Sequence, residues 1–208
     1  MLLGVFIRED TVGNPSRILA SDFAGGRQDY VVVGNDYCAR TPVDVVSRKT
    51  HPSAGPFDVD LKPPAAGIEC RTGGATGDHK VVVTFAVPVT LSSASVTSGT
   101  GSVSSVTVSG NQVFVNLTGV ANAQTIAISL FSVNDGTNTG NVVIPMSVLL
   151  GDTTSSTAVN SSDISQTKAQ SGTVVSATNF RQDVTVSGSI NSTDVSTVKS
   201  KSGTALPP

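Results

Sequence analysis

The C-terminal quarter of the chain repeats itself with a period of 31 residues, and this repeat limits the possible folds more than any other feature. Residues 152–173 align with residues 183–204, and half of the aligned positions are identical. Each copy has Asp at its first and twelfth positions. These are the acidic residues of the chain after position 151: Asp152, Asp163, Asp183 and Asp194. The regular placement of the acids indicates that they share one role.

The spacing inside each copy is that of a calcium loop. Asp at position 1, Thr at 3, Ser at 5, Asn at 9 and Asp at 12 occur in both copies. A twelve-residue calcium loop places side-chain oxygens at these positions and a backbone carbonyl at position 7, because the ion prefers several hard oxygen ligands. We therefore predict Ca²⁺ as the cofactor, with these ligands: Asp152, Thr154, Ser156, Ala158, Asn160 and Asp163 in the first loop, and Asp183, Thr185, Ser187, Ser189, Asn191 and Asp194 in the second.

Residues 151–205 resemble the dockerin family. The resemblance rests on Asp at position 12, Asn at position 9 and one helix-like segment after each loop, which ends at Gly172 or Gly203. It implies a small helical domain with two tandem calcium loops, which docks through the starts of its helices onto a cohesin-type receptor. The aliphatic residues at position 8, Val159 and Ile190, are expected to point inward and to pair across the two loops.

The repeat departs from the dockerin pattern in two ways. Positions 3 and 5 carry Thr and Ser where dockerin loops usually carry Asp or Asn, and position 6 is Gly188 in the second loop but Thr157 in the first. Two carboxylates per loop predict a weak, extracellular type of calcium affinity, because ligand charge tunes that affinity. A repeat that keeps the fold without the ion is the alternative.

The preceding segment is almost free of charge. Charged residues make up 13% of the chain, and none lies between Lys80 and Asp135. Val, Ser, Thr and Gly fill this span, and turn residues separate short apolar runs, as in an antiparallel sandwich. We predict a mainly β protein, with an immunoglobulin-like sandwich over residues 80–150 and a small α-helical dockerin-like domain over residues 151–208. The predicted strands are Val81–Val87, Ser95–Thr97, Val103–Val108, Gln112–Leu117, Thr125–Phe131 and Val142–Leu149.

Residues 1–79 are predicted to form a strand- and loop-rich region that packs on the sandwich. Pro and Gly are frequent over residues 41–79, which indicates loops around one short strand at 57–61. His51 and His79 lie in this region and are interpreted as surface or turn residues without a catalytic or metal role. Cys38 and Cys70 are expected to form a disulfide, and two separate buried thiols are the alternative.

No arrangement of residues typical of an active site is present, so we expect no enzyme. A net charge of −2 gives no electrostatic reason to expect nucleic acid as a partner, and the apolar residues 1–7 are too short for a membrane span. We expect an extracellular or cell-surface structural protein that is stabilised by calcium and assembles with copies of itself into a fibre or surface layer. Strand edges without charge favour such contacts, and residues 1–7 are a candidate donor strand. The alternative is an anchoring module that binds a cohesin-like protein.

Overall fold

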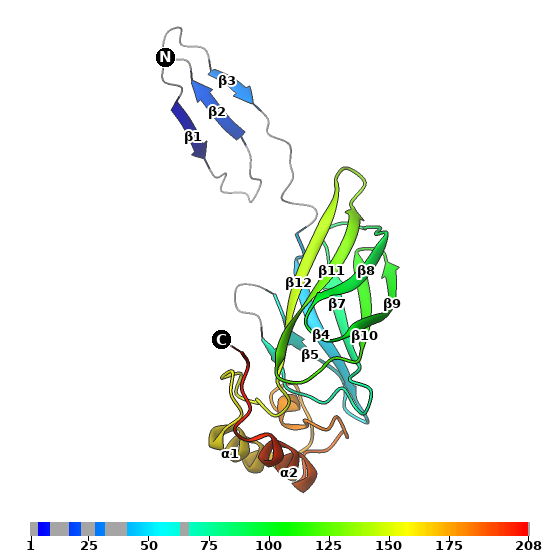
Figure 1. The fold of residues 1–208 in the computed structure, drawn as a ribbon, viewed down its shortest axis with the longest axis vertical. Coiled ribbons are helices and arrows are strands. Elements are labelled where there is room, and N and C mark those ends of the chain that lie inside the picture. Colours follow the sequence, from blue (N-terminus) through cyan, green and yellow to red (C-terminus); the bar gives the residue numbers. More distant parts are fainter. Residues whose placement is uncertain (1–3, 9–16, 22–27, 32–40, 63–66, 208) are drawn as a thin grey trace.

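The computed structural model describes residues 4–8, 17–21, 28–31, 41–62 and 67–207, and the protein is mainly β (Figure 1). The first three strands form a small antiparallel sheet in the order β1-β2-β3. Their bounds are Gly4–Arg8 for β1, Arg17–Ser21 for β2 and Gln28–Val31 for β3. The strand predicted in residues 1–7 is therefore confirmed over the described residues.

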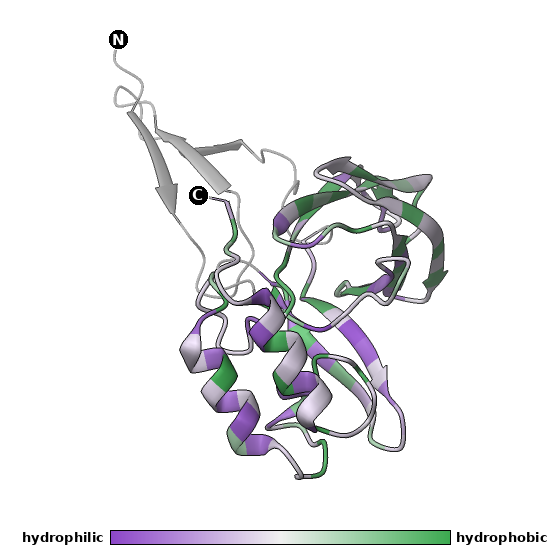
Figure 2. Ribbon diagram, turned by 60° about the horizontal axis from the view of Figure 1, so that its bottom comes forward, coloured by the Kyte–Doolittle hydropathy of each residue, from purple (hydrophilic) through white to green (hydrophobic). Residues whose placement is uncertain are grey.

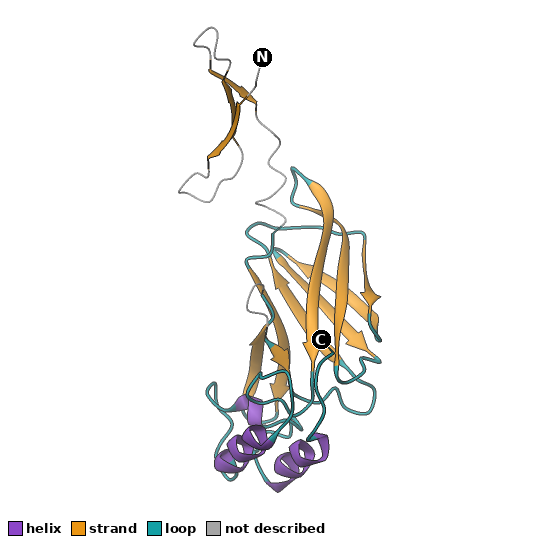
Figure 3. Ribbon diagram, turned by 60° about the vertical axis from the view of Figure 1, so that its left-hand side comes forward, coloured by secondary structure: helices purple, strands orange, loops and turns teal. Residues whose placement is uncertain are grey.

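Two further sheets face each other as a sandwich, with the helices gathered at one end (Figure 3). One sheet has the order β5-β4-β7-β10-β9 and the other has the order β6-β12-β11-β8. Every pairing is antiparallel except that of β6 with β12. The strands are β4 (Asp44–His51), β5 (Gly55–Asp60), β6 (Ile68–Glu69), β7 (His79–Thr84), β8 (Ser93–Ser98), β9 (Ser102–Ser109), β10 (Gln112–Thr118), β11 (Gln124–Asn134) and β12 (Thr139–Val148).

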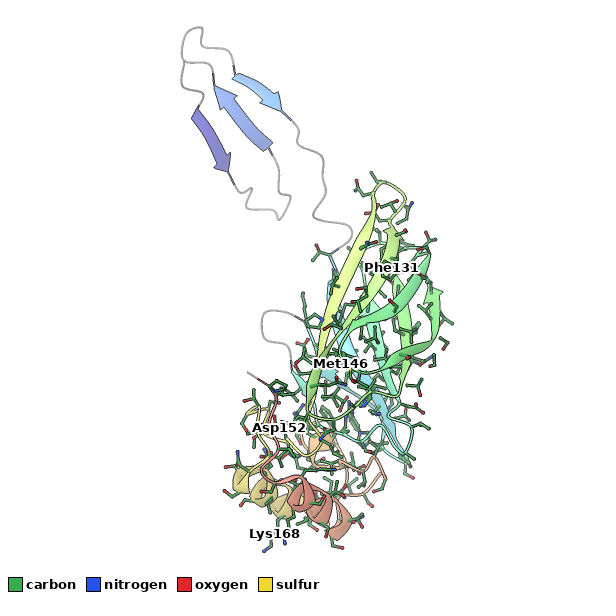
Figure 4. All side chains as sticks on the ribbon, in the orientation of Figure 1. Phe131, Met146, Asp152 and Lys168 are labelled. Atoms are coloured by element: carbon green, nitrogen blue, oxygen red, sulfur yellow. The ribbon has the colours of Figure 1, made fainter. Side chains whose placement is uncertain are left out.

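The core of the sandwich comes from alternate residues of these strands. In β10, Val113, Val115 and Leu117 are buried while the residues between them are only partly covered, as expected for a strand with one face on the core. Met146 of β12 is also fully buried within the sandwich (Figure 4). Hydrophobic residues alternate with polar ones along the strands (Figure 2). This burial against a second sheet stabilises the strands from β8 to β12, none of which contains a charged residue.

The six strands predicted after residue 80 are confirmed, and so is the strand near residue 57. The sandwich also includes β4, in a region that we interpreted as loop. Val45, Ser47 and His51 share the inward face of β4, so two polar residues interrupt the apolar alternation that identifies a strand. The two sheets thus include strands from both sides of residue 80.

A helical module follows the last strand. It contains α1 (Ser161–Gln170), a short 3₁₀ helix η1 (Phe180–Gln182) and α2 (Ser192–Lys201). Asn160 caps α1 and Asn191 caps α2, each in a capping box with the Asp three residues later. The two helices predicted from the repeat are therefore confirmed. No helix in the described residues is long and apolar enough to cross a bilayer.

The module packs directly on the end of the sandwich. A second hydrophobic cluster joins Ile68 and Leu149 of the sandwich end to Val159, Val184 and Val198 of the module. Because these residues are nearly or fully buried, the helices and the sheets share apolar surface at their junction.

The position-8 residues Val159 and Ile190 are both buried, as predicted. Their backbone hydrogen bonds do not join the two loops to each other. Val159 exchanges hydrogen bonds with Gly203 and Thr204, which follow α2, and Ile190 accepts one from Gly172, which follows α1. Each loop is thus bonded to the chain that follows the other copy's helix.

Candidate metal centre

The first loop closes around two buried carboxylates. The Asp152 carboxylate accepts hydrogen bonds from the backbone N–H groups of Ser156 and Thr157, both at 2.9 Å. The Asp163 carboxylate accepts one from the N–H of Thr154 at 2.9 Å and a second from the N–H of the helix cap. Both carboxylates are fully buried. Asp152 lies where the chain passes from the sandwich into the helical module (Figure 4).

Neutral oxygens of the same loop complete the cluster. Thr154 Oγ1 lies 2.8 Å from Asp163 Oδ1 and 3.3 Å from Asp152 Oδ1, so one hydroxyl contacts both carboxylates. Ser156 Oγ lies 3.5 Å from Asp152 Oδ1 and 2.9 Å from the carbonyl oxygen of Ala158. The Asn160 amide also approaches that carbonyl, at 3.3 Å. The structure therefore brings all six predicted positions of the first loop together.

The second loop has the same arrangement. The Asp183 carboxylate accepts from the N–H groups of Ser187 at 2.9 Å and Gly188 at 2.8 Å. Asp194 Oδ1 accepts from both the N–H and the hydroxyl of Thr185, at 3.0 and 2.7 Å. The carbonyl of Ser189 accepts from the Ser187 hydroxyl at 3.0 Å and from the Asn191 amide at 3.4 Å. The twelve predicted ligand positions thus lie in two matching clusters, in which Asn160 and Asn191 turn their NH2 groups to the loop carbonyl and their oxygens to the N–H groups of Ser162 and Thr193.

The separations within each cluster suit a shared cation. Ligand oxygens about 2.3–2.6 Å from one calcium ion lie about 2.8–3.6 Å from one another, and the hydroxyl–carboxylate distances above, from 2.7 to 3.5 Å, largely overlap that range. Two carboxylates, two hydroxyls and a carbonyl make a hard-oxygen donor set. Within the described residues no three His, Cys, Asp or Glu side chains gather at a possible metal site, so an ion in either loop relies on the neutral oxygens.

The charge of the first loop supports the same interpretation. Asp152 and Asp163 accept hydrogen bonds only from N–H groups and hydroxyls in the part of the chain that the structure describes. The nearby Arg181 guanidinium donates to the carbonyls of Asp152 and Thr153 instead. Buried charges are normally paired or bound to a metal, because an uncompensated charge in a protein interior is costly. The residues present therefore fit calcium.

Position 6 differs between the loops for a structural reason. Gly188 has φ +85°, and a Cβ there would lie 2.1 Å from the carbonyl oxygen of Pro52, in the β4–β5 turn. Thr157 has a similar φ of 71° but is exposed. The second loop thus requires glycine because it touches the sandwich, whereas the first loop tolerates a side chain pointing to solvent.

Sequence reasoning missed a buried polar network beside the second loop. Arg71 pairs with Glu69 through Nε at 2.8 Å and Nη2 at 2.7 Å, and both side chains are fully buried. Burial alone would raise the pKa of Glu69, but the Arg71 guanidinium lowers it to about 2. Arg71 also reaches His51, which lies 2.7 Å from Asp183. The network therefore links the sandwich to a predicted calcium ligand.

The interpretation of both histidines as surface or turn residues is wrong. His51 is fully buried at the end of β4, and His79 is 5% exposed at the start of β7. Burial, followed by repulsion from Lys49, lowers the pKa of His79 to about 4. The Pro- and Gly-rich composition around them concealed β4 and the first two residues of β7, so no local signal marked either histidine as buried.

Cys70 is fully buried and forms no disulfide with another described residue. Its Sγ lies 3.5 Å from the carbonyl oxygen of Arg181, and burial raises its pKa to about 11. Cys38 lies outside the described residues. The disulfide between them therefore stays a prediction.

The chain matches no protein-family model, no curated protein sequence and no solved structure.

Proposed function

We propose that this chain is a non-enzymatic extracellular structural protein whose dockerin-like C-terminal module binds calcium in both loops. The observation that carries the proposal is the burial of two carboxylates in each loop, bridged by one threonine hydroxyl. A calcium ion would neutralise these charges and bind the convergent oxygens of positions 1, 3, 5, 7 and 12, while the Asn oxygen at position 9 caps the helix. The capping boxes start each helix from a residue of its loop, so an ion would also stabilise the helices.

The composition of the loops suits an extracellular location. With two carboxylates per ion, the expected dissociation constant is about 10⁻⁴ to 10⁻³ M, the range of extracellular calcium modules. Such sites fill where calcium is millimolar and remain empty at cytosolic concentrations. We therefore propose that the protein lies outside the cell or on its surface. There, bound calcium stabilises the fold.

Calcium titration with paired variants tests the proposal. The unaltered protein is expected to bind two ions, and Asp163→Asn and Asp194→Asn are each expected to bind one. Asp44→Asn is the matched control, because Asp44 is an exposed carboxylate on β4 far along the chain from either loop. Absence of calcium binding by the unaltered protein at millimolar calcium would contradict the proposal.

We propose that the immunoglobulin-like sandwich is the part that assembles with further copies. β8 and β9 are the outer strands of their sheets on the same side, and neither contains a charged residue. Val108 of β9 is 40% exposed. Edge strands usually carry Lys or Pro that prevents pairing with another chain, so these two edges favour contacts between copies.

Sedimentation velocity over a range of protein concentrations tests this assembly. The unaltered protein is expected to sediment faster as its concentration rises, and Thr107→Lys on the β9 edge should suppress that increase. Thr137→Lys, at an exposed site between β11 and β12, is the control. A protein that stays monomeric at the highest concentration would exclude self-assembly while leaving the calcium proposal intact.

Anchoring to a cohesin-like receptor is the second candidate. Both helices begin with exposed small hydroxyl residues at equivalent positions, which suit a docking face used in either of two orientations: Ser161, Ser162 and Ser165 on α1, and Ser192, Thr193 and Ser196 on α2. Titration with purified cohesin domains in calcium, compared with titration in chelator, distinguishes this candidate from self-assembly. Binding that needs calcium would favour anchoring, and no binding would favour assembly.

A further inference from the structure

His51 connects the sandwich to the second loop through a fixed tautomer. Its Nε2 lies 3.3 Å from Arg71 Nη1, and its Nδ1 lies 2.7 Å from Asp183 Oδ2. A guanidinium only donates, so Nε2 is the acceptor and the proton of the neutral ring is on Nδ1. His51 therefore donates a hydrogen bond to Asp183.

Arg71, which fixes the orientation of His51, is itself fixed by several hydrogen bonds. Besides its pair with Glu69, Arg71 donates from Nη1 to the carbonyl of Phe57 at 2.9 Å and from Nη2 to the carbonyl of Ser47 at 3.0 Å. Its guanidinium also lies 5.2 Å from the centre of the Phe180 ring. A fully buried side chain with this many partners cannot change rotamer freely, so the orientation of His51 is fixed as well.

The first loop has no equivalent of this support. Among the described residues, the hydrogen bonds to the Asp152 carboxylate all come from its own loop. Asp183 receives the same loop donors and, in addition, the His51 proton from the sandwich. Two independent contacts hold the second loop at the same place: Thr72 N–H donates to the carbonyl of Val184 at 2.7 Å, and the backbone at Gly188 abuts Pro52.

We propose that the sandwich completes the second calcium loop and that His51 is a positioning residue for its ligand Asp183. The His51 bond occupies Oδ2 and leaves Oδ1 directed at the Thr185 and Ser187 hydroxyls. Donors that hydrogen-bond a metal ligand without touching the metal orient that ligand, and their loss typically lowers metal affinity by about 10–100-fold. The two ions are therefore unequal, and only the ion in the second loop depends on the sandwich. This inference rests on the proposed calcium binding.

Two polar substitutions of His51 separate its contacts. An asparagine amide reaches the place of Nδ1, so His51→Asn keeps a donor for Asp183. A glutamine amide reaches the place of Nε2, so His51→Gln keeps the contact with Arg71 and loses the donor. Each substitution is combined with Asp163→Asn, so that only the second loop can bind calcium. Each is also combined with Asp194→Asn, so that only the first loop can bind it.

Calcium titration up to tens of millimolar, followed by the NMR signals of each loop, then gives the calcium affinity of each loop. We expect His51→Gln to weaken the second loop by about 10–100-fold and the first loop by less than about twofold, with His51→Asn restoring most of the loss. His79→Gln is the control for loss of a buried histidine, since His79 lies on β7 and its buried Nδ1 has no hydrogen-bond partner in the described structure. It should leave both affinities unchanged.

Equal losses at both loops, or an unchanged second loop in His51→Gln, would overturn the inference while the calcium proposal stands. Absence of calcium binding before any change to His51 would overturn both. A measurement without substitution of His51 covers the case in which a variant does not fold. Calcium added to Asp163→Asn should shift the NMR signal of the His51 Nδ1 proton, and calcium added to Asp194→Asn should not; equal responses would also overturn the inference.

Discussion

The contact between Gly188 and Pro52 gives the most direct test of how the helical module is joined to the sandwich. Gly188→Ala would place a Cβ 2.1 Å from the Pro52 carbonyl oxygen and 2.9 Å from its carbonyl carbon. Real Cβ atoms do not approach other heavy atoms closer than 3.0 Å, so the second loop and the β4–β5 turn must separate by about 1 Å. Pro52 directly follows His51, and the same movement would stretch the 2.7 Å bond between His51 and Asp183 beyond hydrogen-bonding distance.

Gly203→Ala is the matched control. Gly203 has φ +88°, nearly the φ of Gly188, but a Cβ there would meet nothing within 4 Å. The left-handed backbone alone costs an alanine about 1–2 kcal/mol, and this cost applies to both variants. Overpacking against a backbone adds about 1–3 kcal/mol, and only Gly188→Ala bears it.

Urea unfolding in saturating calcium measures both variants. We expect Gly188→Ala to be less stable than Gly203→Ala by about 1–3 kcal/mol, and to melt at least about 2–4 °C lower for each kcal/mol of that difference. Equal losses of stability in the two variants would refute the reasoning, because they would mean that the second loop can move away from the β4–β5 turn without a loss of free energy.

Three further predictions concern buried groups of the sandwich. Burial lowers the pKa of His79 from 6.5 to about 4. Between these two pH values the unfolded chain binds a proton that the folded chain does not. The contribution of His79 to the free energy of unfolding is therefore complete above pH 6.5 and is lost as the pH falls to about 4. His79→Gln should remove on the order of 3 kcal/mol of that loss in urea titrations without calcium, and an unchanged pH dependence would contradict the assignment. Glu69→Gln leaves the buried Arg71 charge unpaired and should lower the free energy of unfolding by about 3–5 kcal/mol. The double variant Glu69→Leu with Arg71→Met removes both charges and should regain much of this loss. A double variant as unstable as Glu69→Gln would contradict the prediction. Cys70, with a pKa of about 11 and no exposure, should resist iodoacetamide at pH 8 until the protein unfolds, and rapid labelling of the native protein would show that it is accessible.

The helical module could be predicted because its signals are local. Asn160 and Asn191 cap the helices, the Asp three residues later closes each capping box, and glycine follows each helix end. All of these signals lie within about twenty residues and occur twice. The oxygen clusters follow from the same short spacing, so the twelve candidate ligands could be placed without knowledge of the fold.

The junction could not be predicted because its partners are remote in sequence. His51 and Asp183 are 132 positions apart, and nothing near either residue indicates the other. β4 was missed for a related reason, since Ser47 and His51 occupy inward positions where a strand normally carries apolar residues. These side chains are inward-facing because Glu69 and Arg71 provide their hydrogen bonds, which only the folded chain can show.

The crossed backbone pairing of the two copies has a consequence for the order of folding. Val159 of the first loop bonds to Gly203 and Thr204, and the N–H of Leu206 donates to the carbonyl of Thr157. During synthesis from the N-terminus, the sandwich strands leave the ribosome before these closing residues exist. The backbone bonds between the first loop and residues 203–206 therefore form only after both repeats have been made. A shortened chain that ends before Gly203 would carry both pairs of carboxylates but would lack these backbone bonds to the first loop.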